Sequence, residues 1–286
     1  MSAVAITHNP GLATPGIPLP TGDVVLGGPG MPRRVWVAQI MGMPISVTVR
    51  GARVRDAATA ERLNGAVEKV FAELREVDTT FSMWRASSEA NRVARGELAI
   101  ADACADVRLV HDLTEQAKAI TAGWFDAMLP DGRGDARWDP TGLVKGWAVE
   151  RASLRLSGLV GDWCVNAGGD VVLVPGPDDP QPWLVGIEDP GDRSLVLAAV
   201  SLVEGGIATS GSAARGGHVI DPRTGEPVTT PGSLTVHGPS LMWSDVWATA
   251  AYASGPRAPD LLAAAGGYGW AVVDRQGSYP TVRSSG

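Results

Sequence analysis

Cysteine is scarce in this sequence. The 286 residues include only two cysteines, Cys104 and Cys164, which are too few and too far apart for a disulfide framework or a zinc site. Both lie among apolar neighbours, a setting typical of buried thiols. We therefore expect both side chains to be buried and structural.

Excess positive charge and long apolar runs are also missing. The formal net charge is -7 at pH 7, and the basic residues are scattered rather than gathered into a run that could bind DNA or RNA. No stretch reaches the length of a transmembrane helix. We expect neither a nucleic-acid surface nor a membrane span.

The first 34 residues lack the pattern of a secretory signal, which is a basic segment followed by a continuous apolar one. Arg33 and Arg34 could suggest a twin-arginine signal, but the residues after them alternate like a strand and carry no cleavage site. Frequent proline and glycine predict a disordered or loosely tethered arm over 1–34. We expect one domain over 35–286 and a cytoplasmic location, with export as the open alternative.

Glycine and proline are abundant, with 36 and 21 residues, which favours strands and shaped loops over a helical bundle. The length and the 44% hydrophobic content allow one large domain or two intimately packed halves. The apolar periodicity predicts helices over 55–82, 106–124 (with Asp106 as N-cap), 142–158, 241–255 and 258–266. Strands are predicted over 35–51 with a bend at Gly42, and over 163–174, 182–189, 195–211, 232–238 and 268–274. Strands in groups, rather than in strict alternation with helices, predict an α+β fold with mostly antiparallel sheets.

Two glycine-rich stretches have spacings that suit ligand binding. In "NAGGDV", residues 166–171, Gly168 and Gly169 precede Asp170 and allow close approach by a ligand or another backbone; a bulge or tight turn is the alternative. "DPTGLVKG", residues 139–146, leads into a helix whose amino terminus favours anions, although it lacks the spacing of a P-loop.

Asp245 and Thr249 are four residues apart on a predicted helix, so their side chains share one face. A carboxylate and a hydroxyl are hard oxygen donors of the kind that Mg²⁺ uses. The alternative is structural, with Asp245 as a helix cap and Thr249 bonded back to its own helix. His111 lies inside a predicted helix and is expected to be a surface or packing residue.

Six motifs follow the Met41–Gly42 bend: "FSMWRASSEANRV", "GWFDAMLP", "DPTGLVKGWAVERA", "VNAGGDV", "IATSGSAARGGHVIDPRTGEPV" and "SDVWATAAYASG". In this order they resemble the FAD:protein FMN transferases, the ApbE-like flavin transferases, from about Met41 to Gly255. The resemblance implies that FAD is cut between its phosphates, FMN is transferred to a threonine of a target protein, and AMP leaves. It also implies a T-fold-like pair of intimately associated α+β halves.

The resemblance implies three groups of site residues. His218 would be the base that activates the acceptor hydroxyl, with a structural imidazole bonded to Asp221 as the alternative. The metal set for Mg²⁺ would be Asp245 and Thr249 with backbone oxygens of Gly142 and Ala248. The set that binds the flavin nucleotide would be Met41, Trp84, Trp124, Phe125, Asp126, Asp139, Lys145, Gly168, Gly169, Asp170, Thr209, Ser210 and Val219.

The chain departs from the family pattern in three places. Only "AMLPDGRGDARW" separates Asp126 from Asp139, Trp84 stands where a tyrosine is usual, and "SAARGG" shortens the approach to His218. Two other functions use the same residues: a Mg²⁺-dependent FAD pyrophosphatase that replaces the acceptor with water, and a flavin-binding protein without turnover. The first partner expected is FAD, and the second is a protein with an acceptor threonine.

Overall fold

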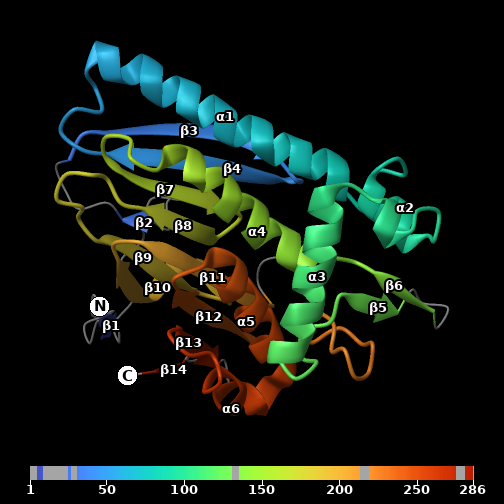
Figure 1. Ribbon diagram of the computed structural model, residues 1–286. Helices are drawn as coiled ribbons and strands as arrows, with labels where there is room; N and C mark the ends of the chain where they lie inside the picture. Colours follow the sequence, from blue (N-terminus) through green and yellow to red (C-terminus); the bar gives the residue numbers. More distant parts are fainter. Residues whose placement is uncertain are drawn as a thin grey trace.

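The computed structural model describes residues 5–8, 25–26, 31–130, 135–212, 219–274 and 281–285. An eight-stranded sheet forms the middle layer, and the helices α1, α4 and α5 lie along one of its faces (Figure 1). A four-stranded sheet packs against the other face. Every strand pair in the described part of the chain is antiparallel. The predicted α+β class with mostly antiparallel sheets is therefore confirmed.

The strand order is β14-β13-β12-β11-β8-β7-β4-β3 in the large sheet, β1-β10-β9-β2 in the small one and β5-β6 in a separate hairpin. The strands are β1 Ala5–His8, β2 Val25–Leu26, β3 Arg33–Ile40, β4 Met43–Arg50, β5 Met128–Pro130, β6 Ala136–Trp138, β7 Asp162–Ala167, β8 Asp170–Val174, β9 Trp183–Asp189, β10 Asp192–Leu202, β11 Gly205–Gly211, β12 Gly232–Gly238, β13 Gly269–Asp274 and β14 Thr281–Ser284. The α-helices are α1 Ala57–Phe81, α2 Glu89–Ala94, α3 Ala105–Ile120, α4 Thr141–Ser153, α5 Leu241–Ser254 and α6 Ala258–Leu262.

Alternating side chains divide the strands of the large sheet between two cores. On β7, Trp163 and Val165 face α1 and α4, whereas Cys164 faces the small sheet. The strands β3, β4, β7 and β8 carry α1 and α4, and the strands from β11 onward carry α5 and α6. The β8–β11 pairing joins these two halves into one continuous sheet.

The predicted strand, bend and strand over 35–51 form the hairpin β3–β4. Its two loop residues, Met41 and Gly42, both have positive φ, at 55° and 71°. Two-residue hairpin loops with this backbone match the twist of the flanking strands. Met41 is held in a conformation that favours glycine, which is a cost commonly found at functional sites.

The sequence pattern was accurate for most helices and missed smaller elements. α1 buries Leu63, Val67 and Leu74 at helical spacing, as predicted. The N-cap of α3 is Cys104 rather than Asp106, because the helix begins two residues earlier than predicted and Asp106 lies in its first turn. The short elements α2, β5, β6 and β14 were not predicted, since three to six residues show too little periodicity.

One of the two cysteines differs from expectation. Cys164 is buried, but Cys104 is only half-buried because it caps α3. Within the arm, β1 pairs with β10 and β2 pairs with β9. The looser state predicted for the arm stays a prediction, because its other residues up to residue 30 lie outside the described part. Across the described residues, no helix combines the length and apolar character needed to cross a membrane.

The turn in "NAGGDV" joins β7 to β8. Gly168 and Gly169 have φ values of 65° and 106°, and the Asn166 side-chain oxygen accepts a hydrogen bond from the Gly169 N–H at 2.9 Å. This is the tight turn that the sequence left as an alternative to a ligand contact. Gly168 also lies against Met43, since a Cβ added to it would be 3.1 Å from the Met43 sulfur.

His237 on β12 predicts a loss of stability in acid. Its side chain is buried, its Nε2 has no hydrogen-bond partner among the described residues, and burial lowers its pKa to about 4 from 6.5. The folded state therefore favours the neutral imidazole, and the unfolded chain binds a proton at His237 more readily than the folded protein does. The free energy of unfolding is highest above pH 6.5 and decreases as the pH falls toward 4. Protonation should cost roughly 3 kcal/mol of the free energy of unfolding.

Denaturant unfolding of the parent and of His237→Phe across this pH range measures the effect. We expect the phenylalanine variant, which keeps an aromatic ring against Gly269, to lose less stability than the parent on acidification. An equal acid-induced loss in both proteins would assign the pH dependence to other groups.

Candidate active site

A cavity of about 630 Å³ opens between the helices and the ends of strands of the large sheet, a volume within the range of small-molecule sites. Residues of the β3–β4 turn, the end of α1, the 124–126 segment, α4, the β7–β8 turn, β11 and α5 line it. The predicted site residues that line it are Met41, Trp84, Trp124, Phe125, Asp126, Asp139, Gly142, Lys145, Gly168, Asp170, Thr209, Ser210, Val219, Asp245 and Thr249.

Three predicted site residues are not in this lining. Gly169 lies at the open side of the β7–β8 turn, and a Cβ added to it would meet nothing within 4 Å. Ala248 is fully buried in α5, directly before Thr249. His218 lies outside the described residues, whereas the next residue, Val219, is buried and lines the cavity.

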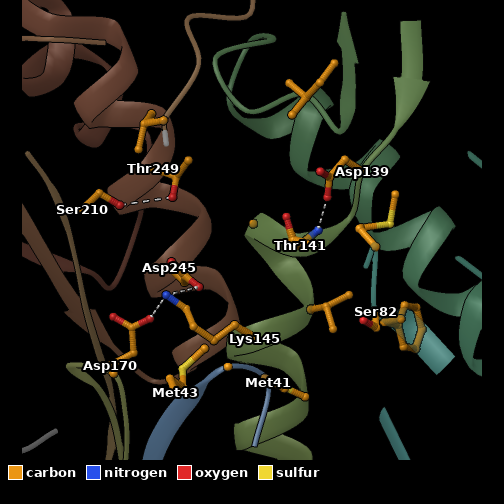
Figure 2. A pocket seen from close by; sticks show the side chains of 18 of the residues that line it. Met41, Met43, Ser82, Asp139, Thr141, Lys145, Asp170, Ser210, Asp245 and Thr249 are labelled. Carbon is orange, nitrogen blue, oxygen red and sulfur yellow. Dashed lines mark hydrogen bonds and ion pairs between the residues drawn. The ribbon is translucent and has the colours of Figure 1, made fainter. Parts of the chain in front are cut away.

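The amino terminus of α4 enters the cavity from "DPTG". The Asp139 carboxylate accepts a hydrogen bond from the Thr141 N–H at 3.0 Å, which holds the chain where the helix begins (Figure 2). Gly142 follows and packs against Phe125, whose ring would be 3.3 Å from an added Cβ. The N–H groups of Leu143 and Val144 both donate to the Pro140 carbonyl oxygen, so the positive end of the helix dipole, rather than a row of free N–H groups, gives this cavity wall its preference for anions.

Lys145 lies between two carboxylates from different elements, Asp170 of β8 and Asp245 of α5 (Figure 2). Its Nζ forms an ion pair with Asp170 and lies 3.6 Å from Asp245 Oδ2. Both carboxylates are almost fully buried, with 3% and 6% of their side chains exposed. Among the described residues, two buried carboxylates from different elements thus meet at one ammonium, at the wall of the cavity.

Asp245 and Thr249 do share one face of α5, one turn apart, as the spacing predicted. The Thr249 hydroxyl lies 3.2 Å from the Ser210 hydroxyl of β11 (Figure 2). The N-cap of α5 is Ser240, whose hydroxyl accepts from the Trp243 N–H, so Asp245 is not the cap of this helix. The capping alternative for Asp245 is therefore wrong.

The hydroxyls of Thr209 and Ser210 lie on opposite sides of β11. Ser210 faces α5, but the Thr209 hydroxyl lies 2.8 Å from that of Thr235 on the opposite face of the sheet. The Thr209 N–H donates to Asp170 at 3.2 Å, so its backbone contributes to the cavity wall. Strand alternation was the signal that would have separated these two neighbours.

Aromatic and charged side chains form the rim of the cavity. Trp84 is 98% exposed, and the Arg223 guanidinium lies 3.8 Å from the ring centroid of Trp124. Lys118 pairs with Asp126 at 2.8 Å, and this bond raises the pKa of Lys118.

Sequence reasoning missed several further lining residues, which are Met43, Asp78, Ser82, Arg85, Leu129, Thr141 and Ile220. Most lie inside the motifs of the series, next to residues that were predicted, and this position is the signal that could have found them.

The donor set fits Mg²⁺ better than a softer metal. No group of three or more His, Cys, Asp or Glu side chains in the described ranges is placed to hold a metal ion. Asp245 and Thr249 instead offer one carboxylate and one hydroxyl, and Mg²⁺ commonly takes its other oxygens from substrate phosphates and water. The Lys145 ammonium beside Asp245 shows that this position attracts positive charge.

Gly146 predicts how closely α4 and α5 must pack. A Cβ at this position would lie 2.9 Å from the Met242 Cα, so Gly146→Ala must displace α5. Overpacking costs about 1–3 kcal/mol, which exceeds the roughly 0.5–1 kcal/mol that alanine gains over glycine inside a helix. We expect thermal unfolding to show that Gly146→Ala is less stable than the parent.

Gly65→Ala on α1 is the matched control, because an added Cβ there meets nothing within 4 Å. Its melting temperature should equal or exceed that of the parent. Equal changes in melting temperature at both sites would contradict the packing argument.

Comparison with known proteins gives matches in sequence and in fold. Residues 128–269 match the sequence model of the ApbE family. An FAD:protein FMN transferase of Klebsiella pneumoniae is 33% identical over 129 residues, which is 41% of this chain and 37% of that protein. The Escherichia coli K12 protein of the same name is 39% identical over 85 residues, 26% of this chain and 24% of that protein. The aligned parts thus span well under two thirds of these curated relatives.

Solved structures match over a longer part of the chain. The ApbE protein of Thermotoga maritima has a TM-score of 0.72 at 18% identity, covering 89% of this chain and 97% of that one. The flavin transferase ApbE of Vibrio cholerae has a TM-score of 0.71 at 19% identity, covering 90% and 98%. These likenesses concern the fold. The segment that matches the ApbE family contains Asp139, Lys145 and Asp245, and the chain shares its fold with solved ApbE structures, so it is similar to this family in both sequence and fold.

Proposed function

We propose that this protein transfers the FMN part of FAD to a threonine hydroxyl of a target protein and releases AMP, with Mg²⁺ as the metal. The observation that carries the proposal is the single cavity in which the amino terminus of α4, Lys145 and the Asp245–Thr249 pair meet. This arrangement places the positive end of a helix dipole and an ammonium beside hard oxygen donors, as a diphosphate with a metal requires. The names of the sequence relatives support the same activity.

The bond changes in this reaction balance without an oxidant or reductant. The threonine oxygen forms a bond to the phosphorus of the FMN phosphate, and the bond from that phosphorus to the oxygen bridging to AMP breaks. AMP leaves with the bridging oxygen, and the hydroxyl proton passes to a base, for which we propose His218. A positioned base of this kind contributes roughly 10²–10⁴-fold to the rate.

Different residues of the cavity would bind the metal and the phosphates. Asp245 and Thr249, with backbone oxygens of Gly142 and Ala248, would hold Mg²⁺. When bound, the metal supplies positive charge that offsets the negative charge growing on the phosphates. The positive end of the α4 dipole and the Lys145 ammonium would attract the phosphate oxygens.

The apolar and aromatic wall would bind the ring systems of FAD. Met41, Trp124 and Phe125 lie on this wall, and the exposed Trp84 stands at its rim, where an aromatic face can stack on a flat ligand. The Gly168 backbone lies at the same cavity, in the turn between β7 and β8. Because the walls come from both halves of the sheet, the ligand would span the β8–β11 junction.

Mass spectrometry after incubation with FAD and Mg²⁺ tests the proposal. The protein is incubated with a candidate acceptor that carries a threonine, and in parallel with the same acceptor in which alanine replaces that threonine. We expect only the acceptor with the threonine to be flavinylated. One AMP should be released for each FMN that is transferred. AMP and free FMN at equal rates in every arm would show a pyrophosphatase, and FAD binding without AMP would show a binding protein.

A further inference from the structure

Glu150 joins α4 to the amino terminus of α5. One of its carboxylate oxygens, Oε2, accepts hydrogen bonds from the Ser240 hydroxyl at 2.8 Å and from the Met242 N–H at 2.9 Å. Ser240 is the N-cap of α5, and its hydroxyl also accepts from the Trp243 N–H at 3.3 Å. A carboxylate from another helix thus completes the cap of α5, at the helix end where negative charge is favourable.

The same two helices carry the charged centre of the cavity. Lys145 and Glu150 both belong to α4, while Met242 and Asp245 both belong to α5. Between these contacts, Gly146 lets α4 approach α5 so closely that an added Cβ would be 2.9 Å from the Met242 Cα and 3.3 Å from the Asp245 Cβ. The helices therefore run antiparallel here, with one hydrogen-bonded anchor and one close backbone contact.

This geometry gives Glu150 control over the position of Asp245. The close contact at Gly146 sets the distance between the two helices, and the Ser244 hydroxyl, which donates to the Gly206 carbonyl oxygen at 3.2 Å, holds α5 against β11. The two hydrogen bonds to Glu150 hold the amino-terminal end of α5. Because the N–H groups of a helix point along its axis, the bond from the Met242 N–H resists movement of α5 along that axis. Asp245 follows Met242 by three residues, so sliding or fraying of the first turn would move its carboxylate relative to Lys145.

We infer that Glu150 is a positioning residue for the metal site: it holds α5 in the register at which Asp245 and Thr249 face the cavity together. The inference rests on the proposed function, since it assigns Mg²⁺ to these two side chains. Residues that orient metal ligands without touching the metal typically change metal affinity by about 10–100-fold when they are lost. Glu150 does not line the cavity within the described part of the chain, so it acts through α5.

Binding of Mn²⁺, a spectroscopic substitute for Mg²⁺, tests the inference without turnover. The full chain is titrated with Mn²⁺ in the presence of FAD, without acceptor, and free Mn²⁺ is measured by electron paramagnetic resonance. We expect Glu150→Ala to weaken Mn²⁺ binding by about 10–100-fold. Glu150→Gln keeps a side-chain oxygen that can accept both hydrogen bonds, so its affinity should stay within about threefold of the parent.

The matched control is Glu73→Gln. Glu73 of α1 also ties a neighbouring element to α4, through ion pairs with Arg151 at 2.8 Å and Arg155 at 2.9 Å, but it does not bond α5. Its replacement should leave Mn²⁺ affinity unchanged even where the melting temperature falls. If Glu150→Ala does not fold, Ser240→Ala removes one of the two bonds and should weaken Mn²⁺ binding several-fold.

The outcomes separate this inference from the proposed function. Parent affinity for Mn²⁺ that is lost in Asp245→Ala establishes the site itself. With that established, unchanged affinity in Glu150→Ala, or in Ser240→Ala where the first variant does not fold, overturns the positioning role. A parent protein that binds no Mn²⁺ would overturn the metal assignment, and the role of Glu150 with it.

Discussion

Replacing Asp245 by alanine is expected to lower Mg²⁺-dependent AMP release from FAD by on the order of 10³-fold. Asp245 is the carboxylate of the proposed metal set, and a bound metal supplies several kcal/mol of charge stabilisation in a phosphoryl-type transfer. The fold should survive, because Lys145 keeps its ion pair with Asp170 and no buried ammonium is left unpaired. Steady-state assays over a range of Mg²⁺ concentrations, with thermal unfolding alongside, measure both effects.

Two further variants test whether the charge of Asp245 and its position in the cavity cause this effect. Asp245→Asn keeps the size of the side chain but removes its charge, so it should lose activity nearly as severely as the alanine variant. Asp260→Ala removes an exposed carboxylate of α6 that does not line the cavity, and this variant should behave as the parent does. Parent-like turnover in Asp245→Ala with a native-like melting temperature would exclude Asp245 from the metal site.

Replacing His218 by alanine is expected to lower FMN transfer by about 10²-fold or more, while FAD and Mg²⁺ affinity stay close to those of the parent. A positioned general base contributes this much to the rate and little to ligand binding. Its chain neighbour Val219 is buried at the cavity wall, which motivates the assignment. Single-turnover transfer at saturating FAD, compared with FAD binding by calorimetry, separates the two quantities.

The pH dependence of the His218→Ala variant gives a second criterion. A histidine base must be neutral to accept a proton, so the parent should lose activity in acid and the variant should be slow and less dependent on pH between about 6 and 9. A structural histidine bonded to Asp221 would instead reduce melting temperature and FAD affinity together. Equal transfer rates in parent and variant across this pH range would show that another group or solvent removes the proton.

Local patterns were sufficient wherever neighbouring residues decide the structure. The apolar spacing of α1 and the alternation of β3 and β4 were predictable because one side of each element must meet a core. The shared face of Asp245 and Thr249 followed from helical spacing in the same way. Short elements such as the β5–β6 hairpin escaped notice, because their stability depends on what packs against them.

The motif series by itself pointed to the ApbE-like flavin transferases and to the residues proposed for the site, because the order and spacing of the motifs resemble those of that family. Only the tertiary structure decided which of these groups meet. The ammonium of Lys145 joins Asp170 and Asp245, Glu150 bonds the first turn of α5, and the Thr209 hydroxyl turns away to the other face of its strand. Contacts of the first two kinds link residues far apart in the chain, and their geometry depends on the packing of whole helices and strands rather than on local sequence.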